Sequence, residues 1–230
     1  MIQITDPLAE VRKRCAQALE SLGRRPDDVM LVAVSKQQTV ESIRAAVRAG
    51  LKDFGESYVQ EAIPKQKALA DLALVWHFIG KIQGNKTRAV AESFDWVHSL
   101  DRARIAQRLS EQRPQGMPPL NVLIQVNIAN EAQKSGIRPD DVVELARYVH
   151  SLPGLSLRGL MSVTPAECSP ADRESYYRSV HAIAETLTDL GLPMDTLSMG
   201  MSRDYEIALR CGSNCIRIGT ALFGPRAKVG

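Results

Sequence analysis

The sequence predicts a (β/α)8 barrel formed by a single domain over residues 1–230. Short apolar, β-like runs alternate with helical patterns eight times, and this alternation is typical of parallel βαβ units. The chain has 230 residues and 44% hydrophobic content, enough for the roughly 200 or more residues of a barrel. An open, doubly wound sheet is the alternative. It normally has a glycine-rich phosphate loop after its first strand, and Ser35-Lys36-Gln37-Gln38 is not such a loop.

The expected elements follow one another at regular intervals. Strands are expected at 29–34, 52–54, 74–79, 94–98, 120–127, 156–161, 195–198 and 214–218. Helices are expected at 6–22, 39–49, 56–70, 83–91, 101–113, 139–151, 170–190 and 203–211. The first helix precedes the first strand, and only residues 223–230 follow the last strand, too few for another full helix. We therefore expect the extra N-terminal helix to cover the remaining gap in the outer ring.

Two helices carry clear boundary signals. In the helix at 39–49, apolar residues share one face, and Gly50 suits the position just after a helix. In the helix at 170–190, Ser169 is placed to cap the first turn and Gly191 ends the pattern. The apolar stripe of this second helix consists of Tyr176, Val180, Ile183, Leu187 and Leu190.

Composition argues against several classes of protein. The formal net charge is +3, and the basic residues are scattered along the chain, so neither a nucleic acid nor an anionic membrane is indicated as a partner. Four Phe and five Tyr without interleaved basic residues do not predict a base-stacking surface. The first residues lack a signal sequence, and no apolar stretch approaches the ~18 residues of a membrane span. We expect a cytoplasmic protein.

The four cysteines are expected to be small thiols, buried or partly buried, in a reducing compartment. Cys211 and Cys215 have the spacing of half a metal site. No second pair and no nearby histidine completes such a site. We therefore expect no metal.

Lys36 is the most informative single residue. It closes the run Met-Leu-Val-Ala-Val-Ser-Lys at 30–36, which is typical of a buried strand that delivers a lysine at its carboxyl end. Burying an ammonium group costs several kcal/mol unless the group loses its proton or finds a partner. A lysine held there is a candidate nucleophile, and the chemistry it suggests is a Schiff base with a carbonyl compound.

Polar residues gather where the predicted strands end. Barrels take their active residues from these carboxyl ends and often hold a phosphate after strands seven and eight. Gly200 would let backbone N–H groups approach an anion, and Ser202 supplies a hydroxyl beside the helix that starts near Arg203. Gly219 and Thr220 supply a matching amide and hydroxyl. Ordinary turns are the alternative.

Three further strand-end residues have two interpretations each. Arg217 either points into the barrel mouth or lies on the surface, on the opposite side of its strand. His77 either belongs to a ligand site or packs beside Trp76. Asn127 either contacts a cofactor ring or caps the following turn.

Other charged residues near strand ends have ordinary explanations. Glu56 and Asp204 are expected in the first turns of helices, where a carboxylate is favoured. Lys81, Lys86 and Lys134 occupy loop-like segments, where a solvated lysine is the default.

The segments around these positions resemble a known family. In chain order they are Ala33-Val34-Ser35-Lys36, Phe54-Gly55-Glu56-Ser57-Tyr58-Val59-Gln60-Glu61, Trp76-His77-Phe78-Ile79-Gly80, Lys134-Ser135-Gly136, Arg158-Gly159-Leu160-Met161, Ser198-Met199-Gly200-Met201-Ser202 and Arg217-Ile218-Gly219-Thr220. Each motif alone is weak, but their order closely resembles the pyridoxal phosphate homeostasis proteins, which are similar to the N-terminal barrel of alanine racemase. The resemblance runs from about residue 10 to 224.

The resemblance implies a bound cofactor, pyridoxal 5′-phosphate (PLP), joined to Lys36 as an aldimine. It implies that Ser202, Gly219 and Thr220 hold the phosphate and that Arg217 faces the pyridine nitrogen. A guanidinium only donates hydrogen bonds, so it would keep that nitrogen unprotonated. The full expected cofactor-binding set is Lys36, His77, Asn127, Met201, Ser202, Arg217, Gly219 and Thr220.

The sequence departs from the family pattern at two places. Ser57 stands where the family usually has asparagine, which bears on local hydrogen bonding only. The loop Lys81-Ile82-Gln83-Gly84-Asn85-Lys86 differs from many relatives in its first and fourth residues. This second change falls on a surface that partners could use.

Three functions are compatible with these residues. The family is regarded as a carrier or regulator of PLP without an established turnover reaction, with PLP-dependent apoenzymes as candidate partners and a monomer expected. The alternative is a PLP-dependent racemase, in which Lys36 would be one base. Racemases of this fold take their second base from a C-terminal domain that we do not expect here. A lysine-dependent aldolase ranks third, because no carboxylate is evident at the end of the first strand.

Overall fold

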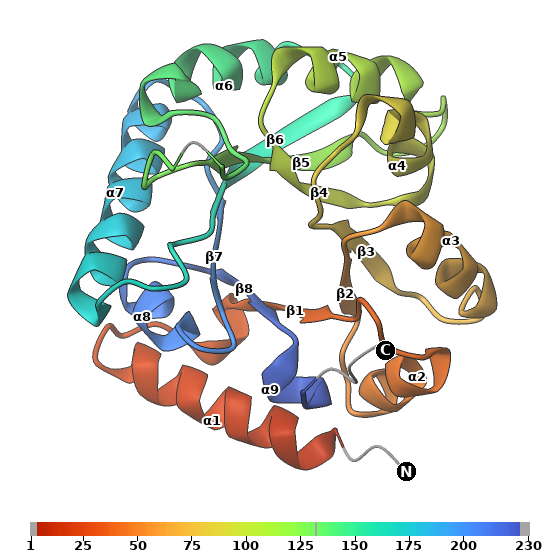
Figure 1. The fold of residues 1–230 in the computed structure, drawn as a ribbon, viewed down its shortest axis with the longest axis vertical. Helices are drawn as coiled ribbons and strands as arrows, with labels where there is room; N and C mark the ends of the chain where they lie inside the picture. The colour runs from red at the N-terminus through yellow and green to blue at the C-terminus, as the bar shows by residue number, and fades with distance from the viewer. Residues whose placement is uncertain (1–3, 132, 226–230) are drawn as a thin grey trace.

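The computed structural model describes residues 4–131 and 133–225, and within them eight parallel strands close into a barrel (Figure 1). The strands are β1 (Met30–Val34), β2 (Asp53–Glu56), β3 (Val75–Phe78), β4 (Trp96–Leu100), β5 (Leu120–Val126), β6 (Leu155–Ser162), β7 (Thr196–Met201) and β8 (Cys215–Ile218). The barrel closes because β1 pairs with both β2 and β8. The predicted fold class is confirmed, and the open sheet is excluded.

Helices form an outer ring around the strands (Figure 1). They are α1 (Thr5–Glu20), α2 (Val40–Arg48), α3 (Val59–Ala68), α4 (Thr87–Ser93), α5 (Ala103–Gln112), α6 (Val142–His150), α7 (Pro170–Asp189), α8 (Tyr205–Arg210) and α9 (Thr220–Phe223). Three short 3-10 turns, η1 (Pro26–Asp28), η2 (Gly84–Lys86) and η3 (Pro139–Asp141), lie between them.

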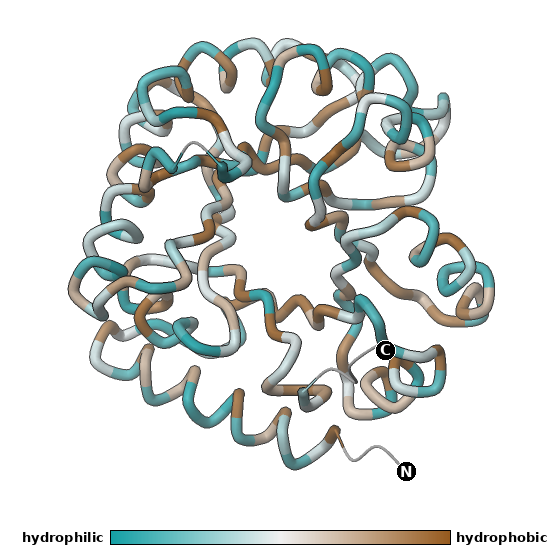
Figure 2. The backbone as a smooth tube through the Cα atoms, viewed as in Figure 1, coloured by the Kyte–Doolittle hydropathy of each residue, from teal (hydrophilic) through white to brown (hydrophobic). Residues whose placement is uncertain are grey.

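The expected N-terminal helix α1 packs against α8 and α9 and so fills its place in the ring. Its inner side is apolar, with Leu8, Val11 and Leu19 among its buried residues. Apolar and polar positions alternate along α1 in Figure 2, as in an amphipathic helix. The burial of this stripe explains why a helix outside the βα repeat belongs to the fold.

The single turn α9 after β8 is shorter than a full helix, in line with the expectation that no full helix follows the last strand. Two other helices differ from expectation. Helix α3 begins at Val59 and not at residue 56, because Glu56 is the last residue of β2. In α7 the buried face contains Tyr177 and Ala184 besides the predicted Val180 and Leu187. The predicted helical period of α7 is correct, but its buried face starts at Tyr177 and not at Tyr176.

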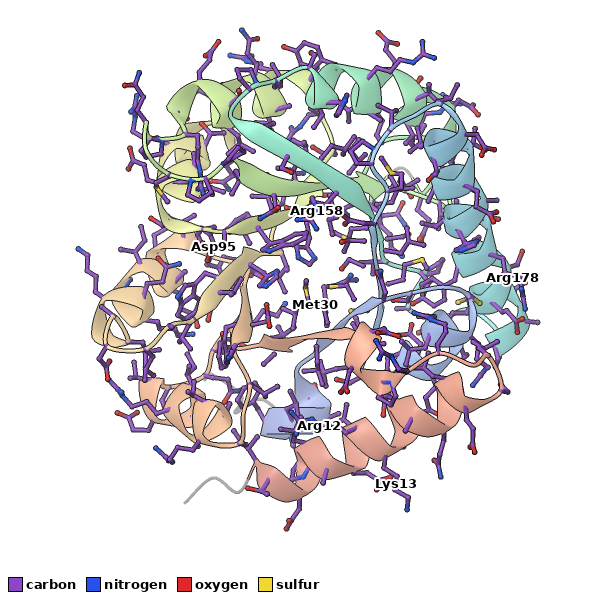
Figure 3. All side chains as sticks on the ribbon, turned by 180° about the vertical axis from the view of Figure 1, so that it is seen from behind. Arg12, Lys13, Met30, Asp95, Arg158 and Arg178 are labelled. Atoms are coloured by element: carbon purple, nitrogen blue, oxygen red, sulfur yellow. The ribbon has the colours of Figure 1, made fainter. Side chains whose placement is uncertain are left out.

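The barrel interior contains a small apolar layer, separate from the main core. There Trp96, Leu123 and Met161 pack together, with Met30 against them. Figure 3 shows Met30, at the start of β1, near the middle of the barrel. This layer fills part of the barrel interior with apolar side chains.

Gly159 is needed where β6 passes β7. Its φ is +153°, and a Cβ there would lie 1.9 Å from the carbonyl oxygen of Thr196. We expect Gly159→Ala to lower the free energy of unfolding by about 3 kcal/mol, because both the backbone and β7 must shift. Gly84→Ala is the matched control, since a Cβ at Gly84 meets no atom within 4 Å. Equal urea midpoints for the two variants would contradict this prediction.

The four cysteines are free thiols, three of them buried and Cys168 partly buried, as predicted. Burial raises the pKa of Cys15 and of Cys215 to about 11, so both stay protonated at neutral pH. None of the helices in the described ranges has the length and apolar character needed to cross a membrane.

Candidate functional site

A cavity of about 320 Å³ opens at the carboxyl ends of the strands, between β1, β7 and β8. Volumes of roughly 300 Å³ and above are typical of small-molecule sites. Six of the eight residues predicted to bind a cofactor line it, namely Lys36, Met201, Ser202, Arg217, Gly219 and Thr220. These residues come from three separate parts of the chain, and barrel closure brings them together.

Lys36 follows β1 by two residues, is partly buried and lines the cavity. The turn that carries it is held from beneath by Lys65 of α3 and Glu56 of β2. The Ser35 hydroxyl donates to Glu56 Oε1 at 2.7 Å. The Gln37 backbone N–H donates to Glu61 Oε1. Both neighbours of Lys36 are therefore fixed by charged groups.

Lys65 uses all three of its N–H groups in this arrangement. They go to the Ser35 carbonyl at 2.8 Å, to Glu56 Oε1 at 2.9 Å and to Glu61 Oε1 at 2.5 Å. Glu56 is 0% exposed, and its Oε2 has no partner among the described residues. Burial raises the pKa of Glu56, while the bonds from Lys65 and Ser35 oppose the shift.

This cluster corrects two expectations. Glu56 was expected as an ordinary charge in the first turn of a helix, but it is a buried strand residue. No carboxylate was expected near the end of the first strand, yet Glu56 and Glu61 both lie there. Both are bonded to Lys65, and so they serve the turn around Lys36.

The predicted phosphate-holding residues lie side by side. Ser202 Oγ accepts hydrogen bonds from the backbone N–H groups of Gly219 and Ala221, at 3.3 and 3.2 Å. The hydroxyl of Ser202 is thus oriented by the start of α9, next to Thr220. Hydroxyl and amide donors of this kind suit an anion such as a phosphate.

Asp204 holds the loop that presents Ser202. Its Oδ1 accepts from the Met201 N–H at 2.7 Å, and its Oδ2 accepts from the Tyr177 hydroxyl at 2.9 Å and from Arg173 at 3.3 Å. Asp204 is 4% exposed. It stands at the start of α8 as predicted, but its side chain fixes this loop and does not cap the helix.

Gly200 lies where β7 passes close to α8. Its φ is +91°, and a Cβ there would lie 2.7 Å from Tyr205 Cα. The glycine therefore lets β7 approach α8 closely. The expected approach of an anion to its backbone stays a prediction.

Arg217 points into the barrel, which decides between its two interpretations. It is 5% exposed and lines the cavity. Its Nη1 donates to the carbonyl oxygen and the hydroxyl of Ser198, at 2.7 and 2.6 Å, and its Nη2 donates to the Ser162 carbonyl at 3.0 Å. The guanidinium is held in place by β6 and β7.

Two residues of the expected cofactor set lie elsewhere. Among the described residues that line the cavity, neither His77 nor Asn127 is present. Asn127 bonds through its amide to both the N–H and the carbonyl of Glu131, at 3.2 and 2.8 Å, so it caps the turn after β5. His77 is fully buried between Asp53 and His98.

His98 makes stability depend on pH. Burial, with His77 and Arg217 nearby, lowers the pKa of His98 well below 6.5. Below pH 6.5 the unfolded chain therefore binds a proton that the folded chain does not, and stability falls as the pH falls. We expect this group to contribute a slope of about 1.4 kcal/mol per pH unit below pH 6.5.

Urea unfolding at pH 5.5 and pH 7 measures this slope, with His98→Gln as the comparison. The variant keeps a polar side chain but has no titrating group, so its stability should vary less with pH. Identical slopes for the two proteins would show that His98 is not the responsible group.

Sequence reasoning missed Glu61, Lys65 and His98. A signal existed for Lys65, because it follows Val59 and Ala62 on the buried face of α3. A charged residue on the apolar face of a helix requires a buried partner. For His98 no pattern in the sequence indicated the partners that the barrel supplies.

The fold and cavity define a barrel of the alanine racemase type, and the comparisons with known proteins agree. The sequence model of the family "Alanine racemase, N-terminal domain" matches residues 8–227. The chain is similar to a pyridoxal phosphate homeostasis protein of Pseudomonas aeruginosa, with 53% identity over 226 residues, covering 98% of this chain and 97% of that one. It is also similar to one of Escherichia coli, with 47% identity and 98% of both chains covered. The chain belongs to the pyridoxal phosphate homeostasis protein family.

Solved structures lead to the same family. PipY of Synechococcus elongatus, solved with PLP bound, superposes with a TM-score of 0.81 at 36% identity, covering 91% of this chain and 100% of that one. An alanine racemase from Corynebacterium glutamicum has a TM-score of 0.71 at 14% identity, covering 96% of this chain and 62% of that one. The racemase likeness concerns the fold alone.

Proposed function

We propose that this protein binds, shields and supplies PLP, which it holds as an aldimine of Lys36. The observation that carries this proposal is that one cavity joins Lys36, the Ser202–Thr220 pair and Arg217. Support also comes from the relatives, which are named for pyridoxal phosphate homeostasis, and from PipY, whose structure has PLP bound.

The donors around the cavity match the three polar parts of PLP. The phosphate would lie at Ser202, Gly219 and Thr220, where the two hydroxyl groups can donate to an anion and the Gly219 N–H holds Ser202 in place. The pyridine nitrogen would face Arg217, and the aldehyde would face Lys36. The cavity thus offers an amine, an anion site and a fixed cation to one small molecule.

The covalent step is a condensation. The neutral Lys36 amine attacks the aldehyde carbon, a C=N bond replaces the C=O bond, and the oxygen leaves as water with the two amine protons. No oxidant or second substrate is needed. Addition of water reverses the step, which suits a protein that releases the cofactor to apoenzymes.

Arg217 favours a protein that binds PLP over an enzyme that uses PLP in catalysis. Facing PLP, its guanidinium would keep the pyridine nitrogen unprotonated, and the ring would then draw electrons less strongly than a protonated ring. We therefore propose that the protein catalyses no turnover reaction. We also propose that it works as a monomer in the cytoplasm.

Mass mapping of the hydride-reduced protein tests the proposed function. After incubation with PLP and reduction, we expect the added mass of one cofactor on the peptide that contains Lys36. An adduct on a different lysine, or none, would overturn the proposal. Measurable exchange of the α-hydrogen of alanine in heavy water would support the racemase alternative instead.

A further inference from the structure

A row of polar side chains runs through the barrel interior from Arg217 to the opposite end. Barrels of this type are usually filled with Val, Ile and Leu. Here His77, His98 and Ser198 occupy interior positions and are all 0% exposed. Buried polar groups cost free energy unless each is hydrogen-bonded, so their partners show what the row is for.

Each member of the row contacts the next. Asp53 Oδ1 lies 3.0 Å from His77 Nε2, and His77 Nδ1 lies 2.9 Å from His98 Nε2. His98 Nδ1 lies 2.9 Å from Ser198 Oγ. Ser198 Oγ in turn accepts from Arg217 Nη1 at 2.6 Å. Four consecutive contacts thus join a carboxylate to the guanidinium of the cavity.

The chemistry of the two ends sets the direction of every bond. Asp53 only accepts, so His77 Nε2 carries the proton. A neutral imidazole has one donor and one acceptor, so His77 Nδ1 accepts from His98 Nε2–H. His98 Nδ1 then accepts from the Ser198 hydroxyl, whose oxygen accepts from Arg217. With two neutral imidazoles, this is the only direction that gives each of the five groups a hydrogen-bond partner.

Packing holds the two rings in this geometry. His77 stacks on Trp96, with ring centroids 5.6 Å apart and 17° between the planes, and meets His98 edge-on at 5.1 Å. The guanidinium of Arg158 also lies over the Trp96 ring, with its Cζ 5.0 Å from the ring centroid. Neither imidazole is free to turn without disturbing this layer.

The row ends at the amino-terminal face of the barrel. Asp53 is the first residue of β2, and its side chain is 28% exposed. It lines a second hollow there, together with Arg12, Asp27 and Lys52. The carboxylate is therefore reachable from solvent on the side of the barrel away from Lys36.

We propose that Asp53, His77, His98 and Ser198 are positioning residues for Arg217, joined in a one-directional hydrogen-bond chain that connects the amino-terminal face of the barrel to the cofactor cavity. This hydrogen-bond chain fixes the guanidinium of Arg217, so that its remaining N–H groups point at the ligand. The expected effect on the ligand rests on the proposed function. The hydrogen-bond chain itself is a property of the protein without PLP.

Nitrogen-15 NMR of the histidine rings, in protein without PLP, tests the chain. We expect both His77 and His98 as single tautomers with the proton on Nε2. Asp53→Ala should shift the ring signals of His98 as well as those of His77, although Asp53 does not touch His98. Asp53→Asn, which keeps an acceptor, should restore most of the pattern.

Asp27→Ala is the matched control, because Asp27 lines the same hollow but is not in the chain. A proton on His98 Nδ1 in the unaltered protein would overturn the proposal. So would an Asp53→Ala variant whose His98 signals match those of Asp27→Ala.

A second measurement addresses the cavity. Ser198→Ala removes the hydroxyl that links His98 to Arg217 and leaves only the backbone carbonyl of residue 198 as a partner of Nη1. We expect this variant to raise the dissociation constant for PLP about tenfold and to shift the absorption band of the bound cofactor. Asp27→Ala should change neither. Equal affinity and spectra for Ser198→Ala and unaltered protein would overturn the positioning role. Absence of PLP binding by the unaltered protein would overturn the proposed function and leave the NMR result standing.

Discussion

Lys36→Ala is expected to abolish the covalent attachment of PLP. The reduced variant should carry no added mass, because none of the other described residues that line the cavity is a lysine. The phosphate and pyridine contacts remain, so weak binding should persist. We expect the dissociation constant to rise at least about tenfold, a loss of about 1.4 kcal/mol.

Two further variants distinguish the contribution of the covalent bond to PLP binding from that of the surrounding pocket. Lys81→Ala removes an exposed lysine that does not line the cavity, and it should retain both the adduct and the affinity. Ser202→Ala weakens the phosphate site, so it should lower affinity while the adduct still forms at high PLP concentration. A reduced adduct in Lys36→Ala equal to that of Lys81→Ala would refute the role of Lys36.

Much of the fold could be predicted because each signal was local. Apolar runs of strand length alternate with amphipathic helices, and this pattern allows few topologies. The strand ends located the cavity for the same reason, since parallel strands deliver their carboxyl ends to one face. For this reason Lys36, Ser202 and Arg217 could be predicted from the sequence to lie near one another, and all three line one cavity.

The residues whose roles were not predicted share one physical cause. Their roles depend on contacts between strands and helices that lie far apart in the sequence. Whether Glu56 meets water or Lys65 depends on how α3 packs on β2, which no local pattern specifies. Likewise, the position of His77 at a strand end suggested a ligand residue. Its bonds to Asp53 and His98 form only when the barrel brings β2, β3 and β4 into register.

The cluster beneath Lys36 predicts a large effect on stability. Lys65→Met keeps the aliphatic part of the side chain but removes the ammonium group, which leaves Glu56 buried at 0% exposure without its ion-pair partner. Removing one partner of a buried pair costs about 3–5 kcal/mol. We expect a loss of this size in the free energy of unfolding, measured in urea at pH 7.

A double-mutant cycle with Glu56→Gln separates the charge from the packing. In the double variant Lys65→Met with Glu56→Gln, no buried charge is left unpaired, so it should be more stable than Lys65→Met alone. Asp71→Asn removes a partner from the exposed pair with Arg44 and should change stability little, because solvent screens such pairs. If Lys65→Met were as stable as Asp71→Asn, the buried pair would not be what holds this turn.

The same cycle connects stability to the site. Lys65 and Glu56 both bond to Ser35, and Glu61 bonds to the Gln37 N–H, so their loss frees the backbone on both sides of Lys36. Lys65→Met should therefore also slow the uptake of PLP in conditions where the variant remains folded, and Asp71→Asn should not. An unchanged rate of uptake in folded Lys65→Met would show that the cluster supports the fold without positioning the lysine.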